Sequence, residues 1–322
     1  MLMSTDHKLP ALARATDGRA MGVTLSAALG LKGTVHVRPE MLKHAPGKRA
    51  VLAYTLSGHG DQHLRIVGKL YRDDRGARAF ELLWAVWQAA RSTARGRLEL
   101  PEPIAYLPEL GMVVQGAVAG RPLAHFGPAD DWHGAIRQVA EALAAFHDLD
   151  VRELAPRPLA DHVRRTCHPG PQVLTNWYPE LAVLIQRALE SVQPGDDPAR
   201  APRGAAHGDL GVSQVFVGRV GSAFVDLDST CLAPPALDLG RLIVSLRSRL
   251  GTRACRLEVE LLERYRAARP GASLTGIERY VALAYLRRAC ATLRRGPRLA
   301  DFAAARAALA AAAASGRRRQ AP

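Results

Sequence analysis

The stretch that decides the fold reads His207-Gly-Asp-Leu-Gly-Val-Ser-Gln-Val-Phe-Val-Gly-Arg-Val-Gly-Ser-Ala-Phe-Val-Asp-Leu-Asp228. It holds two short apolar segments, at 215–217 and 223–225, on either side of Arg219-Val-Gly221. This pattern predicts a β-hairpin with a three-residue loop and with Gly221 in the left-handed conformation. The hairpin interrupts an otherwise helical half of the chain, and the chemistry is expected there.

Oxygen-bearing side chains gather at one end of this hairpin. Pairing Gly218 with Ser222 places Gln214 directly opposite Asp226, about 5 Å away. Asp209 lies in the preceding loop, near the same end. Amide and carboxylate oxygens without Cys or His favour Mg²⁺, which takes one or two carboxylates and completes its shell with phosphate oxygens and water. A separate carboxylate can orient a hydroxyl group and accept its proton. The reaction that fits is phosphoryl transfer from a nucleotide.

The N-terminal part predicts a small antiparallel sheet followed by one helix. Alternating apolar residues and Gly-bearing turns indicate strands over 34–38, 49–56 and 64–71. The apolar period then changes to i, i+3, i+4, i+7, which predicts a helix over 75–91. Lys69, in the third strand, is one of only five lysines in an arginine-rich chain, and we expect it to contact phosphate. The alternative is an edge-strand lysine whose ammonium group reaches solvent.

The Gly- and Pro-bracketed stretch 116–122 predicts a hinge. We therefore expect an N-terminal nucleotide-binding lobe over 1–117 and a C-terminal catalytic and substrate lobe over 118–322. Residues 1–33 form a poorly defined extension, and 316–322 a frayed tail. Helices in the second lobe are expected over about 130–150, 176–193 and 236–312.

Taken together, these segments resemble the aminoglycoside phosphotransferase/choline kinase-like small-molecule kinases, which have the protein-kinase-like fold. The resemblance covers about residues 34–290. It implies an α+β protein with a small antiparallel β N-lobe carrying one helix and a larger, mainly helical C-lobe containing the catalytic β-hairpin. The motifs that carry it are His207-Gly-Asp209-Leu-x-x-x-Gln214, the hairpin, Val225-Asp226-Leu-Asp228 and Pro235-Ala-Leu-Asp238-Leu.

The resemblance also implies roles for single residues and implies ATP and Mg²⁺ as cofactors. Asp209 corresponds to the catalytic base, and Asp226 to the metal ligand after the hairpin. Gln214 is its companion ligand, and Asp228 is either a second ligand or a turn residue. The residues assigned to the nucleotide are Lys69 with Glu81 as its helix partner, Gln115 and Ala117 at the hinge, and Lys48 in the first turn.

Three neighbouring residues are expected to support the site without touching substrate. We expect His207 to brace the loop by hydrogen bonding, Asp238 to anchor the loop or cap a helix, and His147 to pack in the core.

Two departures from the family pattern concern the metal and the phosphates. Gln214 stands where most members have Asn, whereas the maltose kinases and some related sugar kinases resemble this pattern with Gln. Pro46-Gly-Lys-Arg49 replaces a Gly-x-Gly-x-x-Gly loop, so Lys48 and Arg49 would supply charge in place of a backbone cradle.

The net charge of the chain limits the chemical class of the acceptor. The chain carries a net charge of +14, and from Arg241 onward it has 18 Arg against five acids. A polycationic acceptor would be repelled by such a lobe. We therefore expect an ATP-dependent transfer to a hydroxyl of a neutral or anionic, sugar-like metabolite.

Other function classes find less support. One alternative is a kinase-fold protein that binds nucleotide without turnover, and another is a basic binder of nucleic acid or membrane surfaces. The arginines lack interleaved aromatic residues and a recognised nucleic-acid module, which disfavours the last class. The four cysteines are widely spaced, so we expect free thiols and no zinc site. With neither a signal peptide nor an 18-residue apolar run, a cytoplasmic protein is expected.

Overall fold

The computed structural model describes residues 6–32, 35–58, 64–93, 96–193, 203–294 and 298–317. The chain forms two compact units, the first comprising Met1–Gly120 with Ala223–Asp228, and the second Arg121–Ser222 with Ser229–Pro322. The segment that carries Asp226 and Asp228 therefore packs with the N-terminal part of the chain, from which it is distant in sequence.

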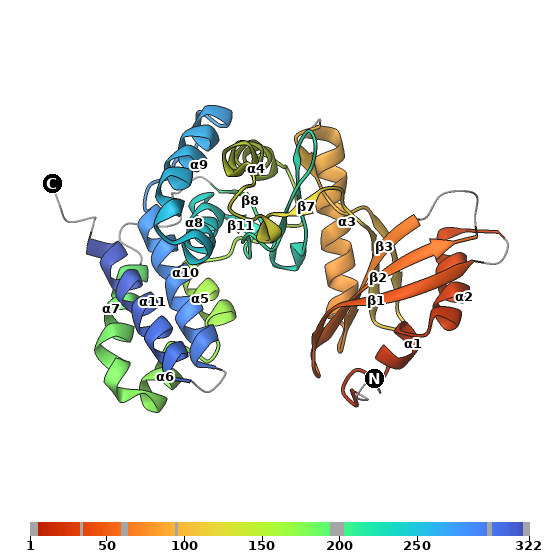
Figure 1. The fold of residues 1–322 in the computed structure, drawn as a ribbon, viewed down its shortest axis with the longest axis horizontal. Helices are drawn as coiled ribbons and strands as arrows, with labels where there is room; N and C mark the ends of the chain where they lie inside the picture. Colours follow the sequence, from red (N-terminus) through yellow and green to blue (C-terminus); the bar gives the residue numbers. More distant parts are fainter. Residues whose placement is uncertain are drawn as a thin grey trace. The chain divides into compact units, whose positions relative to one another are not determined.

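The first unit is built on a five-stranded sheet (Figure 1). Its order is β1 (His36–Ala45), β2 (Arg49–Ser57), β3 (Leu64–Tyr71), β6 (Met112–Gly116) and β5 (Pro103–Leu107). Antiparallel pairing of β1 with β2 and of β2 with β3 confirms the predicted meander. β5 was not expected, because Pro101, Pro103 and Pro108 in and around it indicate a connection. The turn predicted over 57–61, between the second and third strands, lies partly outside the described residues, which omit 59–63.

Two N-terminal helices cover the sheet, where the sequence predicted only a poorly defined extension. They are α1 (Leu12–Ala15) and α2 (Gly18–Leu29), and α2 packs against β1. Met21 and Leu25 of α2 are fully buried. The Tyr54 hydroxyl donates a hydrogen bond of 2.9 Å to the carbonyl oxygen of Ala15. The extension is thus part of the hydrophobic core of the first unit.

The remaining elements of the first unit are α3 (Arg75–Thr93) and β4 (Leu98–Glu99). As predicted, α3 follows the third strand, and it packs against β3, β5 and β6. Leu83 and Val86 form part of its buried side.

The second unit is mainly helical, as predicted. Its helices are α4 (Trp132–His147), α5 (Leu159–Thr166), α6 (Pro171–Trp177), α7 (Ala182–Val192), α8 (Ala236–Leu250), α9 (Ala254–Ala268), α10 (Ile277–Leu293) and α11 (Leu299–Arg317). Short strands β7 (Arg121–Pro122), β8 (Gly204–Ala206), β9 (Val215–Val217) and β11 (Cys231–Ala233) lie among them. Asp131 caps α4 by accepting from the Gly134 N–H at 2.8 Å. The alanine-rich α11 packs against α10 and α7 (Figure 1). Of the expected frayed tail, residues 318–322 lie outside the described part.

The turn between β9 and β10 (Ser222–Phe224) differs from the prediction. The Gly218 N–H donates to the Gly221 carbonyl at 2.9 Å, and Gly221 does not adopt the left-handed conformation. The turn therefore closes one residue earlier than the three-residue loop requires. The predicted three-residue loop, from which the hairpin register was counted, was wrong, because glycine permits several turn types and does not select one.

No helix among the described residues is both long and apolar enough to cross a membrane.

We predict that Leu25→Ala lowers the free energy of unfolding of the first unit by about 2–5 kcal/mol, because it leaves a cavity under α2. Val23→Ala on the same helix is the matched control, since Val23 is 74% exposed. It should change the free energy by no more than about 0.5 kcal/mol. Chemical denaturation of both variants measures the difference, and equal effects would mean that α2 is not part of the core.

Candidate active site

A buried aspartate organises the loop that carries Asp209. Asp238, in the first turn of α8, is fully buried. Its Oδ2 accepts from the His207 N–H at 2.6 Å, and its Oδ1 from the Gly208 N–H at 2.9 Å. His147 lies 3.1 Å from Oδ2 through Nε2 and 2.7 Å from the Tyr265 hydroxyl through Nδ1. The predicted anchoring role of Asp238 is confirmed.

The two histidines also behave as predicted. His207 is fully buried, and its Nδ1 accepts from the Asp209 N–H at 3.3 Å, so it braces the loop from within. His147 packs in the core against Phe146 and Tyr265. Burial raises the pKa of Tyr265 to about 12, so this hydroxyl stays protonated and can donate to His147.

The loop also requires a glycine at 208. Gly208 has a φ of +77°, and a Cβ there would lie 2.3 Å from the Ser229 carbonyl oxygen. No side chain fits that space, and the left-handed backbone disfavours other residues. The tight turn at Gly208 exposes the next residue, Asp209, at the end of the loop.

Asp209 forms ion pairs with two arginines of the second unit. Its Oδ1 accepts from Nη2 of Arg241 and lies 2.7 Å from Nη1 of Arg287. Arg241 is one helical turn after Asp238, so both residues lie on the same face of α8. From this face Asp238 binds the N–H groups of the loop, and Arg241 binds the Asp209 carboxylate. The sequence did not predict either arginine as part of the site.

The first unit contains a second polar cluster, centred on Lys69. Lys69 is 7% exposed and lies in β3 opposite Val51 and Val113. Its Nζ donates to Oδ1 of Asp226 at 2.8 Å and to Oδ1 of Asp228 at 2.7 Å. Asp226 has a φ of +68°, an uncommon conformation for a residue other than glycine, which directs its side chain to this cluster.

Two more residues complete this cluster: Tyr71, which the sequence analysis did not name, and Arg49, which it named only as a source of charge. The Tyr71 hydroxyl donates to Oδ2 of Asp228 at 2.6 Å. Arg49 Nη1 lies 3.5 Å from Asp226 Oδ1 and 3.8 Å from Asp228 Oδ2. Tyr71 is two residues after Lys69 on the same face of β3, a spacing that would have indicated it.

Electrostatics keep the Lys69 cluster charged. Burial acts to lower the pKa of Lys69, but the carboxylates of Asp228 and Asp226 outweigh it and hold the pKa above its ordinary value. Burial raises the pKa of Tyr71, so the Tyr71 hydroxyl remains a donor. Two cations and two carboxylates therefore balance one another.

The carboxylates of this cluster suit a divalent cation. One carboxylate oxygen of Asp226 and one of Asp228 both contact the Lys69 ammonium group. No group of three or more His, Cys, Asp or Glu side chains among the described residues forms a metal site. A pair of carboxylates is nevertheless the protein ligand set that Mg²⁺ commonly uses with phosphate.

Of two other residues predicted to bind the nucleotide, Gln115 and Glu81, only Gln115 lines the cavity beside this cluster. Gln115 is buried and lines the same narrow cavity as Lys69, together with Ala79 and Leu83 of α3. Glu81 is exposed, and it lies about 200° around the helix from Ala79 and Leu83. The hydrogen bonds of Lys69 go to Asp226 and Asp228, and the expected Lys69–Glu81 pair is not among the ion pairs of the described residues.

The last three predicted residues lie in exposed or local settings. Lys48 is exposed in the turn between β1 and β2, and Arg49, the next residue, is the one that reaches the carboxylates. Ala117 is exposed just after β6, with its N–H directed to the Arg65 carbonyl at 3.4 Å. The Gln214 Oε1 accepts from the Ser213 hydroxyl at 3.0 Å.

Comparison with known proteins now identifies the family. Residues 53–275, more than half of the chain, match the family described as "Phosphotransferase enzyme family". The chain belongs to this phosphotransferase family. The resemblance predicted from the motifs and the assignment as a small-molecule kinase are confirmed. Among curated proteins, none matches the sequence of this phosphotransferase.

Solved structures confirm the α+β kinase-like fold of this phosphotransferase. A thermostable mutant of aminoglycoside phosphotransferase APH(4)-Ia, in a ternary complex with AMP-PNP and hygromycin B, is 17% identical, with a TM-score of 0.63 over 92% of this chain and 98% of that chain. A macrolide 2'-phosphotransferase from Brachybacterium faecium is 17% identical, with a TM-score of 0.61 over 91% and 97%. A choline/ethanolamine kinase family protein from Mesorhizobium loti is 17% identical, with a TM-score of 0.58 over 93% and 98%.

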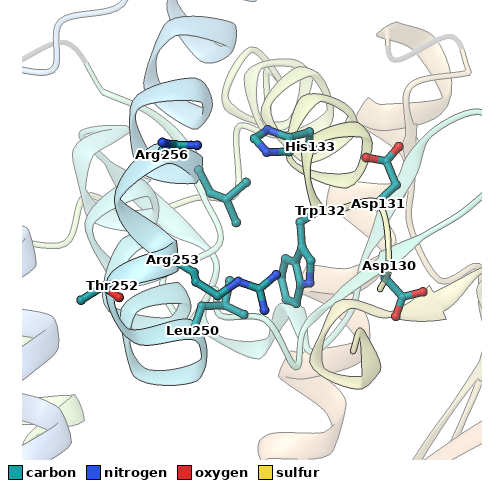
Figure 2. Close-up of a pocket in the computed structure, with 9 residues that line it drawn as sticks. Asp130, Asp131, Trp132, His133, Leu250, Thr252, Arg253 and Arg256 are labelled. Carbon is teal, nitrogen blue, oxygen red and sulfur yellow. The ribbon is translucent and has the colours of Figure 1, made fainter. Parts of the chain in front are cut away.

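A separate cavity of the phosphotransferase lies elsewhere in the second unit. It measures about 440 Å³ and lies among Trp132, Arg253 and Arg256 (Figure 2). Its polar groups already serve the fold, since Asp131 caps α4 and His133 lies 2.5 Å from Glu260. Its Leu250 is nine residues along α8 from Arg241, about 14 Å. This cavity is therefore separate from the ion pairs of Asp209 with Arg241 and Arg287.

We predict that Asp238→Asn destabilises the phosphotransferase by about 3–5 kcal/mol, because an amide cannot accept from all the donors that meet at this buried position. Asp150→Asn, at an exposed position, is the matched control. Thermal or chemical denaturation measures both.

The same residue predicts a pH dependence. Burial acts to raise the pKa of Asp238, but the hydrogen bond from His147 and the charges and N–H groups around it bring the pKa below its ordinary value. The stability that Asp238 contributes is therefore present above about pH 4 and is lost as the pH falls below it. Asp238→Asn should flatten this acid limb, and an unchanged limb would contradict the assignment.

Proposed function

We propose that this phosphotransferase transfers the γ-phosphoryl group of ATP to a hydroxyl of a small, neutral or anionic, sugar-like metabolite. The observation that carries the proposal is the convergence of Asp226 and Asp228 on the Lys69 ammonium group, at 2.8 and 2.7 Å. A buried lysine beside two carboxylates supplies both a phosphate contact and a metal site. The complexes of related folds with AMP-PNP and with ADP support a nucleotide as the phosphoryl donor.

Lys69 would contact the nucleotide phosphates, and Asp226 and Asp228 would hold Mg²⁺. When bound, Mg²⁺ neutralises charge on the phosphates and orients them. Arg49 lies at the same carboxylates and provides a second cation, which compensates for the absence of a Gly-x-Gly-x-x-Gly loop. Gln115 lines the same cavity and offers a polar contact, and Gln214 remains a candidate companion ligand through its amide oxygen.

Asp209 would orient the acceptor hydroxyl and accept its proton. Its loop is held rigidly by Asp238 and His207, which fixes the carboxylate without placing it in the core. Phosphoryl transfer passes through a loose transition state, so positioning of the hydroxyl matters more than the strength of the base. A carboxylate held beside two arginines is compatible with this role.

We predict that Asp226→Ala weakens Mg²⁺-dependent ATP binding by at least about tenfold, because one of the two carboxylate ligands is lost. Asp74→Ala, at an exposed position of the same unit, is the matched control and should bind as the wild type does. Calorimetric titration with ATP, with and without Mg²⁺, makes the comparison. Unchanged Mg²⁺ dependence in Asp226→Ala would rule out this metal site.

We predict that Asp209→Asn lowers phosphoryl transfer by about 10²–10⁴-fold while ATP binding stays within about twofold, because the base is lost and the Lys69 cluster is intact. The acceptor is first found by measuring ATP consumption over a panel of hydroxyl metabolites. Retention of more than a tenth of wild-type turnover in Asp209→Asn would exclude Asp209 as the base. ATP binding by the wild type without turnover on any acceptor would favour the alternative of a nucleotide-binding protein without activity.

A further inference from the structure

Two arginines from different helices meet at one oxygen of Asp209. Arg241 comes from α8 and Arg287 from α10, and both guanidinium groups contact Oδ1. The two helices approach closely at Gly240, where a Cβ would lie 2.9 Å from backbone atoms of Tyr280 and Val281. This close approach fixes both arginines relative to the loop, so their meeting is a built feature of the second unit.

The charges at this point do not balance. Two guanidinium groups face one carboxylate, which leaves a formal charge of +1. The buried acid that adjoins this loop is already bound, because Asp238 accepts from the His207 and Gly208 N–H groups. A buried cation needs a nearby anion to offset its desolvation.

Arg241 also has unused hydrogen-bonding capacity. Its side chain is only 5% exposed, and its Nε has no hydrogen-bond partner among the described residues. Arg287 is 34% exposed, so solutes can reach it. A buried donor without a partner next to an accessible guanidinium group is the arrangement of an anion site.

We propose that Arg241 and Arg287 bind an anionic group, a phosphate ester or a carboxylate, of the acceptor. This inference rests on the proposed function and narrows its acceptor from neutral or anionic to anionic. Planar guanidinium groups bind phosphate and carboxylate oxygens through paired hydrogen bonds. Before the acceptor binds, Asp209 is ion-paired with both arginines. The anionic group of the acceptor then replaces Asp209 as their partner, which leaves the Asp209 carboxylate available to accept a hydrogen bond from the acceptor hydroxyl.

The same chemistry could come from the nucleotide, whose γ-phosphate is also an anion. The two sources differ in their response to a bound nucleotide analogue. An acceptor anion binds together with Mg²⁺–AMP-PNP, whereas an anion that stands in for the γ-phosphate competes with it. Saturating Mg²⁺–AMP-PNP therefore separates the two.

The test measures binding of inorganic phosphate, D-glucose 6-phosphate and D-gluconate, with D-glucose as the uncharged reference, by calorimetry on the full chain in phosphate-free buffer. Arg287→Gln should weaken binding of the anions by about tenfold or more. Arg288→Gln is the matched control, because Arg288 is the next residue of α10, has the same charge and is exposed. It should bind the anions within about twofold of the wild type, which also corrects for long-range charge.

Asp209→Asn provides a second, opposite readout. Removing the carboxylate frees both guanidinium groups, so anion affinity should rise by about threefold or more. A merely structural role for the arginines would not strengthen binding when Asp209 is changed. Circular dichroism and thermal denaturation confirm that each variant is folded.

Three results would overturn the proposal. They are equal anion affinity in Arg287→Gln and Arg288→Gln, loss of the anion when Mg²⁺–AMP-PNP is added, and failure of the wild type to bind any of the three anions below about 10 mM. Binding is measured without turnover. An absence of phosphoryl transfer would therefore contradict the proposed function, whereas the anion site at Arg241 and Arg287 would still stand on the binding data.

Discussion

The second unit depends on one buried carboxylate. Asp238 is without solvent contact, and it accepts from the His207 N–H, the Gly208 N–H and His147. A buried carboxylate is stable only when such donors surround it, so α8, the loop and the end of α4 must come together for any of them to be placed. The turn that exposes Asp209 follows from this constraint, because Gly208 is pressed against the Ser229 carbonyl.

The two polar clusters, around Lys69 and around Asp209, are built by different means. In the first unit, Lys69 of a central strand is balanced by Asp226 and Asp228, residues that the chain delivers from more than 150 positions away. The sheet sets the position of Lys69, the left-handed backbone at Asp226 orients that residue, and Asp228 follows in the short turn Leu227–Ser229. In the second unit, helix packing sets the positions of Arg241 and Arg287 around Asp209. Each cluster is therefore organised by the packing within its own unit.

Two of the many arginines in the last quarter of the chain, Arg241 and Arg287, have a specific place at Asp209. Most of these side chains lie on helix surfaces, where charge is screened within about 8 Å at physiological salt. Arg241 and Arg287 differ because they adjoin the loop aspartate and are wholly or partly shielded from water. The net charge alone disfavours a polycationic acceptor, whereas these two residues indicate which group of an acceptor the protein would hold.

Local patterns were enough to predict much of this protein. Strand alternation, the helical period after residue 74 and the spacing of Asp209, Asp226 and Asp238 depend on a few adjacent residues, and they led to the meander, the kinase-like fold and the loop anchor. The helix over Gly18–Leu29 also had local signals, with Asp17 as its N-cap and Gly30 beyond its end. The hairpin register, the pairing of Arg49, Tyr71 and Lys69 with the carboxylates, and the two arginines at Asp209 could not be read in this way. Each depends on side chains distant in sequence, or on a glycine turn that several backbone conformations satisfy, and only packing in three dimensions selects among them.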